Sequence, residues 1–270
     1  MAPNPKDEFD LAHWKQYDDL FTESLWVIGA RDSTGVHNSS YHGNFIPQIP
    51  NQLIRRFTKF NDIIVDPFLG SGTSLIEAKR LGRKGIGIEL IANVARNARQ
   101  QIVKQTTEYD VEGMQKVITG DAGSIRTFDK VLSITQGEMP TLLILHPPYH
   151  DILKFSENPR CLSKCQSLDE FITRFTDTSE SYVNMLPKGA HIALIMGDKY
   201  CNSELVPLGF LTSTALQQRN SRIRLKSVIV KNMVNNKGKQ GQQQLWRYRS
   251  LRGGFYTFNH EYIFVFEVFR

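Results

Sequence analysis

The stretch that most constrains the fold is an apolar run, Ile63 to Val65, that ends at the Gly-rich segment Asp66-Pro67-Phe68-Leu69-Gly70-Ser71-Gly72-Thr73. A β-branched run followed by a Gly-rich turn and a helix-compatible segment is how a parallel α/β sheet presents a nucleotide-like ligand at the carboxyl end of a strand. The glycines let the backbone approach such a ligand closely, and the following helix offers free N–H groups. We therefore predict a cofactor site at this turn.

Two acidic residues extend this predicted site. Residues 82–89 read as a second buried strand that ends at Glu89, about 20 residues beyond the glycines, where a carboxylate is placed to accept hydrogen bonds from ribose hydroxyls. Residues 117–122 resemble a short third strand that ends near Asp121, whose carboxylate can take the exocyclic amine of an adenine ring. For each acid, a helix N-cap or a solvated loop position is the alternative interpretation.

Composition limits the class of protein. A chain of 270 residues is long enough for one α/β core with an appended element or for two small domains, and we favour one domain with an insertion. No apolar run approaches the roughly 20 residues that span a bilayer, and the polar N-terminus lacks an apolar signal core, so we expect a cytoplasmic protein without membrane contact. The three cysteines fit a reducing compartment, and Cys161 and Cys165 lack a second close pair of ligands, so no metal is predicted.

The positive charge is unevenly distributed. The formal net charge is +6, yet the chain between Leu205 and His260 has ten Lys and Arg residues and no Asp or Glu. A basic region on a mildly acidic body favours a polyanion held on one side, because phosphate attraction is the main sequence-independent part of nucleic-acid binding. A solvated basic face without a ligand is the alternative.

A second strand end carries a distinctive turn. Thr141 to Leu145 is the most hydrophobic predicted strand, and it runs into His146-Pro147-Pro148-Tyr149, a rigid turn with an aromatic residue at its tip. A structural Pro-Pro turn is the alternative to a functional one. Further elements are expected as helices over 12–25, 91–107 and 168–185, an extended Pro-containing segment that becomes a helix over 44–57, and strands over 191–196, 227–230 and 262–268.

The two strand ends together resemble a known family. The Gly-rich turn lacks the third glycine of a dinucleotide-binding fingerprint, since Leu75 stands there, and it lacks the Lys of a P-loop. Paired with His146-Pro-Pro-Tyr149, it resembles the S-adenosylmethionine-dependent DNA amino-methyltransferases, whose motifs are Asp-Pro-Phe-x-Gly-Ser-Gly-Thr and Asp, Asn or Ser before Pro-Pro-Tyr. The resemblance covers about residues 41 to 200. The order of the two motifs is reversed relative to the subgroup that usually carries this form of the first motif.

The resemblance implies roles for individual residues. An exocyclic amine is a poor nucleophile, and acceptors for its two hydrogens localise its lone pair and orient it toward the methyl donor. By resemblance, the Pro147 carbonyl accepts one hydrogen and Tyr149 stacks on a base flipped out of the duplex. His146 stands where the family has Asp, Asn or Ser; a neutral imidazole accepts a hydrogen bond but decides neither adenine nor cytosine. The predicted catalytic residues are His146, Pro147, Pro148 and Tyr149.

The resemblance also implies a cofactor set and a recognition element. S-adenosylmethionine is expected to bind Asp66, Pro67, Phe68, Gly70, Ser71, Gly72, Thr73, Glu89 and Asp121, with Phe45 and Pro47 in the segment that resembles the family's site for the methionine end. Residues 231–256 combine basic, amide and aromatic side chains, which suits phosphate contacts and base-edge contacts. We predict a DNA-recognition insertion there, with contacts from Lys231, Lys237, Lys239, Arg247, Arg249 and Arg252. For the aromatic side chain of Trp246, a core position beneath a loop is the alternative to a role in DNA recognition.

Together these expectations describe a Rossmann-like class I methyltransferase of the α/β class. Its sheet is expected to be mostly parallel with an antiparallel closing strand, with a lead-in over 1–40, a catalytic domain over 41–230 and 257–270, and the small basic insertion between. The predicted activity is methylation of an exocyclic amine in double-stranded DNA, adenine N6 first and cytosine N4 second. RNA methylation is the third candidate function, and a non-catalytic DNA-binding role is the fourth. A cognate restriction endonuclease is a possible partner.

Overall fold

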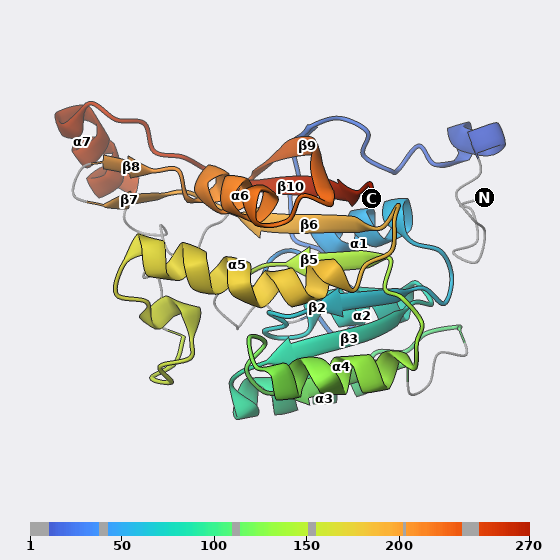
Figure 1. Ribbon diagram of the computed structural model, residues 1–270. Helices are drawn as coiled ribbons and strands as arrows, with labels where there is room; N and C mark the ends of the chain where they lie inside the picture. Colours follow the sequence, from blue (N-terminus) through green and yellow to red (C-terminus); the bar gives the residue numbers. More distant parts are fainter. Residues whose placement is uncertain (1–10, 38–42, 110–113, 151–154, 202–203, 234–242) are drawn as a thin grey trace.

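The computed structural model describes residues 11–37, 43–109, 114–150, 155–201, 204–233 and 243–270 (Figure 1). Lys237 and Lys239, two of the predicted DNA contacts, lie outside the described residues. The described helices are η1 (Leu11–Gln16), α1 (Gln48–Phe57), α2 (Thr73–Arg80), α3 (Ala92–Lys104), α4 (Ile125–Thr135), η2 (Leu162–Lys164), α5 (Leu168–Asn184), α6 (Leu208–Arg219) and α7 (Gln243–Gly253). The strands are β1 (Leu25–Trp26), β2 (Ile63–Asp66), β3 (Lys84–Glu89), β4 (Gln115–Thr119), β5 (Leu142–Leu145), β6 (His191–Met196), β7 (Lys199–Cys201), β8 (Glu204–Val206), β9 (Ile223–Asn232) and β10 (His260–Val268).

One large sheet organises these elements. Its eight described strands run in the order β1-β9-β10-β6-β5-β2-β3-β4, and β7 pairs with β8 in a separate hairpin. Among the described strands of the large sheet, β10 runs antiparallel to both of its neighbours while the other pairs are parallel. The predicted mostly parallel sheet with an antiparallel closing strand is therefore confirmed, although β10 lies inside the sheet and not at its edge.

The strand order creates a switch point between β2 and β5. From β2 the chain builds outward through β3 to β4, and it then returns to place β5 on the other side of β2. At such a reversal the connections leave in opposite directions, which opens a crevice at the carboxyl ends of the two strands. The Gly-rich turn follows β2 and the His146 turn follows β5, so both predicted motifs border this crevice.

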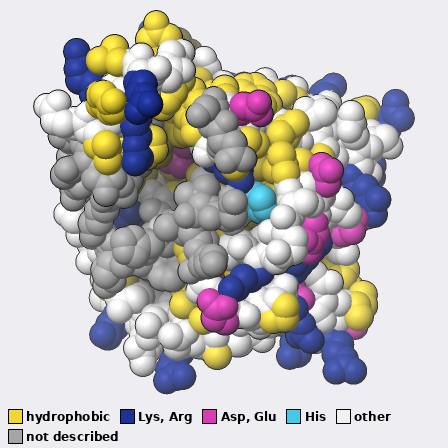
Figure 2. Space-filling model, turned by 90° about the vertical axis from the view of Figure 1, so that its left-hand side faces the viewer, with side chains coloured by type: hydrophobic (Ala, Val, Ile, Leu, Met, Phe, Trp, Pro, Cys, Tyr) yellow, Lys and Arg dark blue, Asp and Glu magenta, His cyan; other side chains and the backbone are white. Residues whose placement is uncertain are grey.

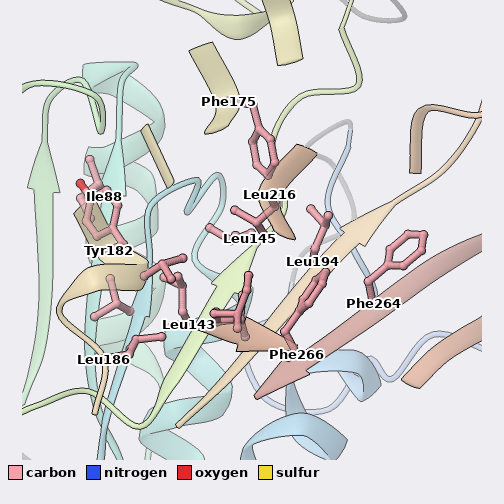
Figure 3. Close-up of a cluster of buried hydrophobic side chains, with 14 of the residues drawn as sticks. Ile88, Leu143, Leu145, Phe175, Tyr182, Leu186, Leu194, Leu216, Phe264 and Phe266 are labelled. Atoms are coloured by element: carbon pink, nitrogen blue, oxygen red, sulfur yellow. The ribbon is translucent and has the colours of Figure 1, made fainter. Parts of the chain in front are cut away.

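Hydrophobic side chains cover both faces of the sheet. Figure 1 shows α4, α5 and α6 in front of the strands, and Figure 3 shows the core that they enclose. Helix α5 contributes Phe175 and Tyr182 to this core, and the strands contribute Leu143, Leu194 and Phe266. The opposite face is covered by α1, α2 and α3, through two further groups of buried residues. Strands β2 and β5 are buried at every position, as expected of central parallel strands covered on both faces.

The N-terminal region differs from the prediction. The expected amphipathic helix over 12–25 is wrong: the structure has η1, with a break at His13, and then β1, which pairs with β9. Most side chains of η1 are exposed, including Trp14 at 61%. The apolar face of the segment has little to pack against, so the periodicity alone does not stabilise a longer helix. Trp26 and Ile28 instead join the core beneath α1.

Other expectations are met more closely. The strand predicted over 191–196 is β6 with the same bounds, and the helix predicted over 168–185 is α5, whose Ser167 side chain accepts a hydrogen bond from the Glu170 amide as an N-cap. The segment between β9 and β10, which includes α7, contains most of the predicted insertion. No described helix is long and apolar enough to cross a membrane.

Candidate active site

A cavity of about 1130 Å³ lies at the carboxyl ends of the strands. Its walls come from the ends of β4, β3, β2, β5 and β6, from the facing ends of β9 and β10, and from the segment before α1. This volume is larger than about 1,000 Å³, the upper end of the range of small-molecule pockets, so the cavity has room for more than one ligand group. The hollow therefore spans both predicted motifs and reaches the region of α7.

The Gly-rich turn enters the cavity because two glycines adopt left-handed backbone conformations. Gly70 has φ of +56° and Gly72 has φ of +92°, which L side chains rarely adopt. The Leu69 amide donates to the Ile88 carbonyl at 2.9 Å, which fixes the turn against β3. As a result Pro67, Phe68, Gly70 and Ser71 of the predicted cofactor set line the cavity.

Several predicted residues support the turn from behind. Asp66 is 1% exposed; its carboxylate accepts from the Phe68 amide at 2.9 Å and from the Ser74 hydroxyl at 2.5 Å. Thr73 donates its hydroxyl to the Asn44 side chain at 2.6 Å. Asp66, Gly72, Thr73 and Pro47 do not line the cavity, and the contacts of Asp66 and Thr73 hold the turn and join it to the segment before α1.

The two predicted acids lie at the end of the cavity formed by β3 and β4. Glu89 lines the wall, and its two oxygens accept from the amides of Gly70 and Ile91 at 2.9 and 2.7 Å. Burial raises the pKa of Glu89 to about 7 despite these hydrogen bonds. Asp121 also lines the cavity, where its carboxylate accepts from the Gly123 amide at 3.0 Å. These carboxylates give this end of the cavity acceptors for hydroxyl and amine hydrogens.

The turn after β5 forms the middle of the cavity wall. His146, Pro147, Pro148 and Tyr149 all line it. The ring of His146 lies 4.9 Å from that of Phe45 and 5.6 Å from that of Tyr149, the latter at 90°. Burial lowers the pKa of His146 to about 4, so the imidazole is neutral at neutral pH. A neutral imidazole retains one nitrogen that accepts a hydrogen bond.

A buried ion pair fixes Tyr149. The Tyr149 hydroxyl donates to Glu261 Oε2 at 3.1 Å, and Glu261 Oε1 accepts from Lys231 Nζ at 2.8 Å. Lys231 and Glu261 occupy directly paired positions of β9 and β10 and are 5% and 7% exposed. Gly197 makes room for the Tyr149 ring, because a Cβ there would lie 3.0 Å from it. The ring is thus held by residues of β9 and β10 and by the segment that follows β6.

The predicted DNA contacts separate into two groups. Arg247, Arg249 and Arg252 lie on α7, and Figure 2 shows Lys and Arg side chains together with hydrophobic ones near the top of this face of the molecule. Lys231 is placed differently from the prediction. It lies in β9, buried and paired with Glu261, because its strand position turns the side chain inward. Trp246 of α7 lines the cavity, and the Arg249 guanidinium lies 5.3 Å from its ring.

Sequence reasoning missed several cavity residues. Glu261 stands at the amino end of an antiparallel strand, which brings it to the same edge as the carboxyl ends of the parallel strands; an acid just before the predicted strand 262–268 was the available signal. Arg31 and Lys199 carried no local motif. The aromatic residues Tyr200 and Phe255, whose rings lie 4.5 Å apart on the cavity wall, belong to segments far apart in sequence.

The described ranges contain no cluster of three or more His, Cys, Asp or Glu side chains able to hold a metal ion. Cys161 and Cys165 are buried as thiols, and the Cys161 sulfur lies 3.1 Å from the Ser163 hydroxyl. Of the two cysteines, Cys161 lines the cavity wall. Within the part of the chain that the structure describes, no further ligands gather around this pair.

Solved structures define the class of fold. The chain superimposes on SMU.776, assigned as a methyltransferase and solved with SAH, with a TM-score of 0.52 over 84% of this chain and 50% of that one, at 9% identity. A Streptococcus mutans protein assigned as a SAM-dependent methyltransferase gives a TM-score of 0.50 over the same shares, also at 9% identity. The fold is that of the class I methyltransferases.

The sequence comparisons point to one family of methyltransferases. Residues 4–100 match the family model N6_N4_Mtase, described as DNA methylase. The match contains the Gly-rich turn and Glu89 and ends before His146. The type II methyltransferase M.MjaII of Methanocaldococcus jannaschii is 33% identical over 98 residues, which are 36% of this chain and 17% of the relative.

Two further relatives extend the comparison. M2.DpnII of Streptococcus pneumoniae is 42% identical over 97 residues, covering 34% of this chain and 33% of the relative. M.BsoBI of Geobacillus stearothermophilus is 30% identical over 139 residues, or 50% of this chain and 27% of the relative. Both are type II methyltransferases. The matched parts of this chain span about a third or less of the length of these relatives.

Proposed function

We propose that this protein transfers the methyl group of S-adenosylmethionine to an exocyclic amine of a base in double-stranded DNA, adenine N6 by preference. The observation that carries the proposal is that the Gly-rich turn after β2 and the His146 turn after β5 line one cavity at the switch point of the sheet. The family match and the type II relatives support the DNA substrate.

The cavity residues fit the proposed cofactor. The left-handed glycines allow close approach of a ligand to the turn, and the carboxylates of Glu89 and Asp121 offer acceptors for the ribose hydroxyls and the adenine amine. Phe45 packs against His146 and so brings the segment before α1 to the reacting centre. When bound, S-adenosylmethionine supplies a methyl group on a positively charged sulfur, which is an electrophile in its own right.

The residues of the β5 turn would activate the amine. The neutral His146 imidazole and the Pro147 carbonyl accept its two hydrogens, which concentrates the lone pair on nitrogen. The transfer forms a bond between nitrogen and the methyl carbon and breaks the bond between that carbon and sulfur. One amine proton is released to water by way of the acceptor, His146 or the Pro147 carbonyl, that faces it. The other product is S-adenosylhomocysteine (SAH).

The aromatic side chains would hold a base outside the duplex. Tyr149, fixed by Glu261 and packed edge-on to His146, offers a ring face for stacking. Cytosine N4 is the second candidate, because a histidine at position 146 matches neither the acid or amide typical of adenine enzymes nor the serine typical of cytosine enzymes. Adenine N6 stays the first candidate because the family that the two motifs resemble more often carries that activity.

Incubation with tritiated S-adenosylmethionine and either duplex DNA or RNA tests the proposal. We expect label in DNA, and digestion to nucleosides should place it on adenine N6. Label on cytosine N4 would keep the class of reaction and change the base. Label in RNA alone, or none in either nucleic acid, would overturn the proposal, and the second result would favour a non-catalytic DNA-binding role. A cognate restriction endonuclease is a proposed partner, to be sought among neighbouring genes.

A further inference from the structure

We infer that Arg31 binds the carboxylate at the methionine end of the cofactor, a role that rests on the proposed function. Arg31 lines the cavity, and its Nη1 donates to the Phe45 carbonyl at 3.0 Å. Its Nη2 is buried and has no hydrogen-bond partner among the residues that the structure describes. A buried guanidinium nitrogen left without an acceptor costs free energy, so it marks a place where a ligand acceptor is expected.

Arg31 also lacks an ion-pair partner within the described residues. The neighbouring carboxylate of Asp32 is engaged elsewhere: it accepts from the amide and hydroxyl of Thr34 and lies 3.4 Å from Arg80. Burial lowers the pKa of Arg31 from its ordinary value, although a guanidinium stays protonated in proteins. The cavity thus has a fixed positive charge that no described carboxylate contacts directly.

The backbone around Arg31 is held on both sides. The Asn232 side chain forms two hydrogen bonds with the backbone of Ile28, and the Gln48 side chain bonds the Ala30 carbonyl at 2.7 Å and the Asp32 amide at 3.1 Å. Arg31 is therefore held between the end of β9 and the first turn of α1 before any ligand arrives. Such preorganisation lowers the entropic cost of binding.

The order of charges along the cavity identifies which end of the cofactor Arg31 meets. Glu89 and Asp121 lie at the β3 and β4 ends, where they suit the donors of an adenosine group. Arg31 is joined through Phe45 to His146, where the methyl group must be transferred. Because the methionine end lies beyond the sulfur from the adenosine, its carboxylate is the anionic group expected there.

Three other basic side chains on the wall already have partners within the protein. Lys231 is paired with Glu261, and Lys199 Nζ lies 2.8 Å from His150 Nδ1. Arg174, from the α5 side, donates to the carbonyls of Pro159 and Arg160. A guanidinium with one nitrogen already anchored and the other open to an acceptor suits a carboxylate, because the planar fork fixes the direction of the second donor.

Calorimetric titration with two ligands tests the inference without requiring activity. SAH has the carboxylate, and 5′-methylthioadenosine keeps the adenosine and sulfur but lacks it. We expect Arg31→Met to weaken SAH binding by about 10- to 100-fold, the range of a hydrogen bond to a charged group, and to change methylthioadenosine binding less than about twofold. Arg31→Lys, which keeps the charge, should recover part of the loss. Arg55→Met, whose side chain pairs with Asp19 away from the cavity, is the matched control.

The outcomes separate this inference from the proposed function. Equal weakening of both ligands, or an unchanged affinity for SAH, would overturn the role of Arg31 while leaving the methyl-donor site in place. Loss of DNA binding with SAH binding intact would also overturn it, since Arg31 would then serve a phosphate. Failure of the unaltered protein to bind either ligand would instead overturn the proposed cofactor itself. Thermal unfolding of each variant confirms that it is folded.

Discussion

The ammonium of Lys231 and the carboxylate of Glu261 lie 2.8 Å apart at directly paired positions of β9 and β10, and the same carboxylate accepts from the hydroxyl of Tyr149. Taking two charges out of water costs free energy that the pair recovers only while both members are present. Removing one member leaves a buried charge without compensation. The pair therefore links the stability of the sheet to the position of an aromatic residue in the candidate active site.

The first prediction concerns this pair. Lys231→Met should lower the free energy of unfolding by about 3–5 kcal/mol, because Glu261 is left buried and unpaired. The double variant Lys231→Met with Glu261→Leu should recover a large part of that loss. Urea denaturation measures both. Arg55→Met, which removes an exposed pair with Asp19, should cost less than about 1 kcal/mol; a similar cost at Lys231 would contradict the prediction.

The second prediction concerns His146. His146→Ala should slow single-turnover methylation by roughly 100-fold or more, because the amine loses an acceptor, while SAH binding changes little. His146→Asn should keep much of the rate, since its side-chain oxygen also accepts a hydrogen bond. Rapid-quench kinetics with labelled cofactor gives the rates. An alanine variant as fast as the unaltered protein would remove His146 from the reaction.

The third prediction is a pH dependence that arises from Glu89. Its pKa is raised to about 7 by burial, and only the ionised form accepts from two ribose hydroxyls while keeping its backbone amides. Affinity for SAH should therefore rise as the pH increases through the pKa and level off above it. Glu89→Gln should bind more weakly and without this pH dependence. Calorimetry at several pH values measures both proteins, and parallel pH profiles would contradict the assignment.

Stability should change with pH in the opposite direction. The folded pKa of Glu89 lies above the ordinary value of 4.5, so the folded state keeps a proton that the unfolded chain loses first. The stabilisation from that bound proton is fully present below the ordinary pKa of 4.5 and is lost as the pH rises through the folded pKa of about 7. In the ligand-free state, the Tm of the unaltered protein should therefore fall relative to the Tm of Glu89→Gln as the pH rises from 4.5 to about 7.

The fourth prediction separates two roles of Tyr149. Tyr149→Phe keeps the ring and loses the hydrogen bond to Glu261, whereas Tyr149→Ala also loses the stacking surface. Stacking of a base on an aromatic ring contributes about 1–3 kcal/mol, so the alanine variant should lose roughly 10- to 100-fold in affinity for DNA with an extruded base, and the phenylalanine variant much less. The fluorescence of 2-aminopurine at the target position reports the extruded state. Equal effects of the two changes would argue against stacking.

The fifth prediction concerns α7. Arg247→Ala and Arg249→Ala together should weaken DNA binding and lower the slope of log affinity against log salt by about 2, one for each phosphate contact. Cofactor affinity should stay unchanged. Lys104→Ala, an exposed residue at the carboxyl end of α3 that does not line the cavity, is the control. A loss of SAH affinity in the α7 variant would mean that the recognition element lies elsewhere.

The sequence predicted those parts of the site that lie next to one another in the chain. The turn from Asp66 to Thr73 and the turn from His146 to Tyr149 each follow an apolar strand. A few consecutive residues are enough to show an apolar strand and the glycines or prolines of the turn after it. The parallel sheet follows from the alternation of such strands with helices. These local signals are confirmed in the fold, including β6 at its predicted bounds.

Only the tertiary structure decided which distant residues complete the cavity. Glu261 reaches Tyr149 because β10 runs antiparallel beside β6, and Arg31 reaches Phe45 because Gln48 and Asn232 hold the backbone on either side of it. The tertiary structure also places Lys231 in a buried ion pair and not on the predicted recognition surface, since strand register sets which way a side chain points. Local pattern determines strand ends and turns, whereas the pairing of strands far apart in sequence determines which charges meet.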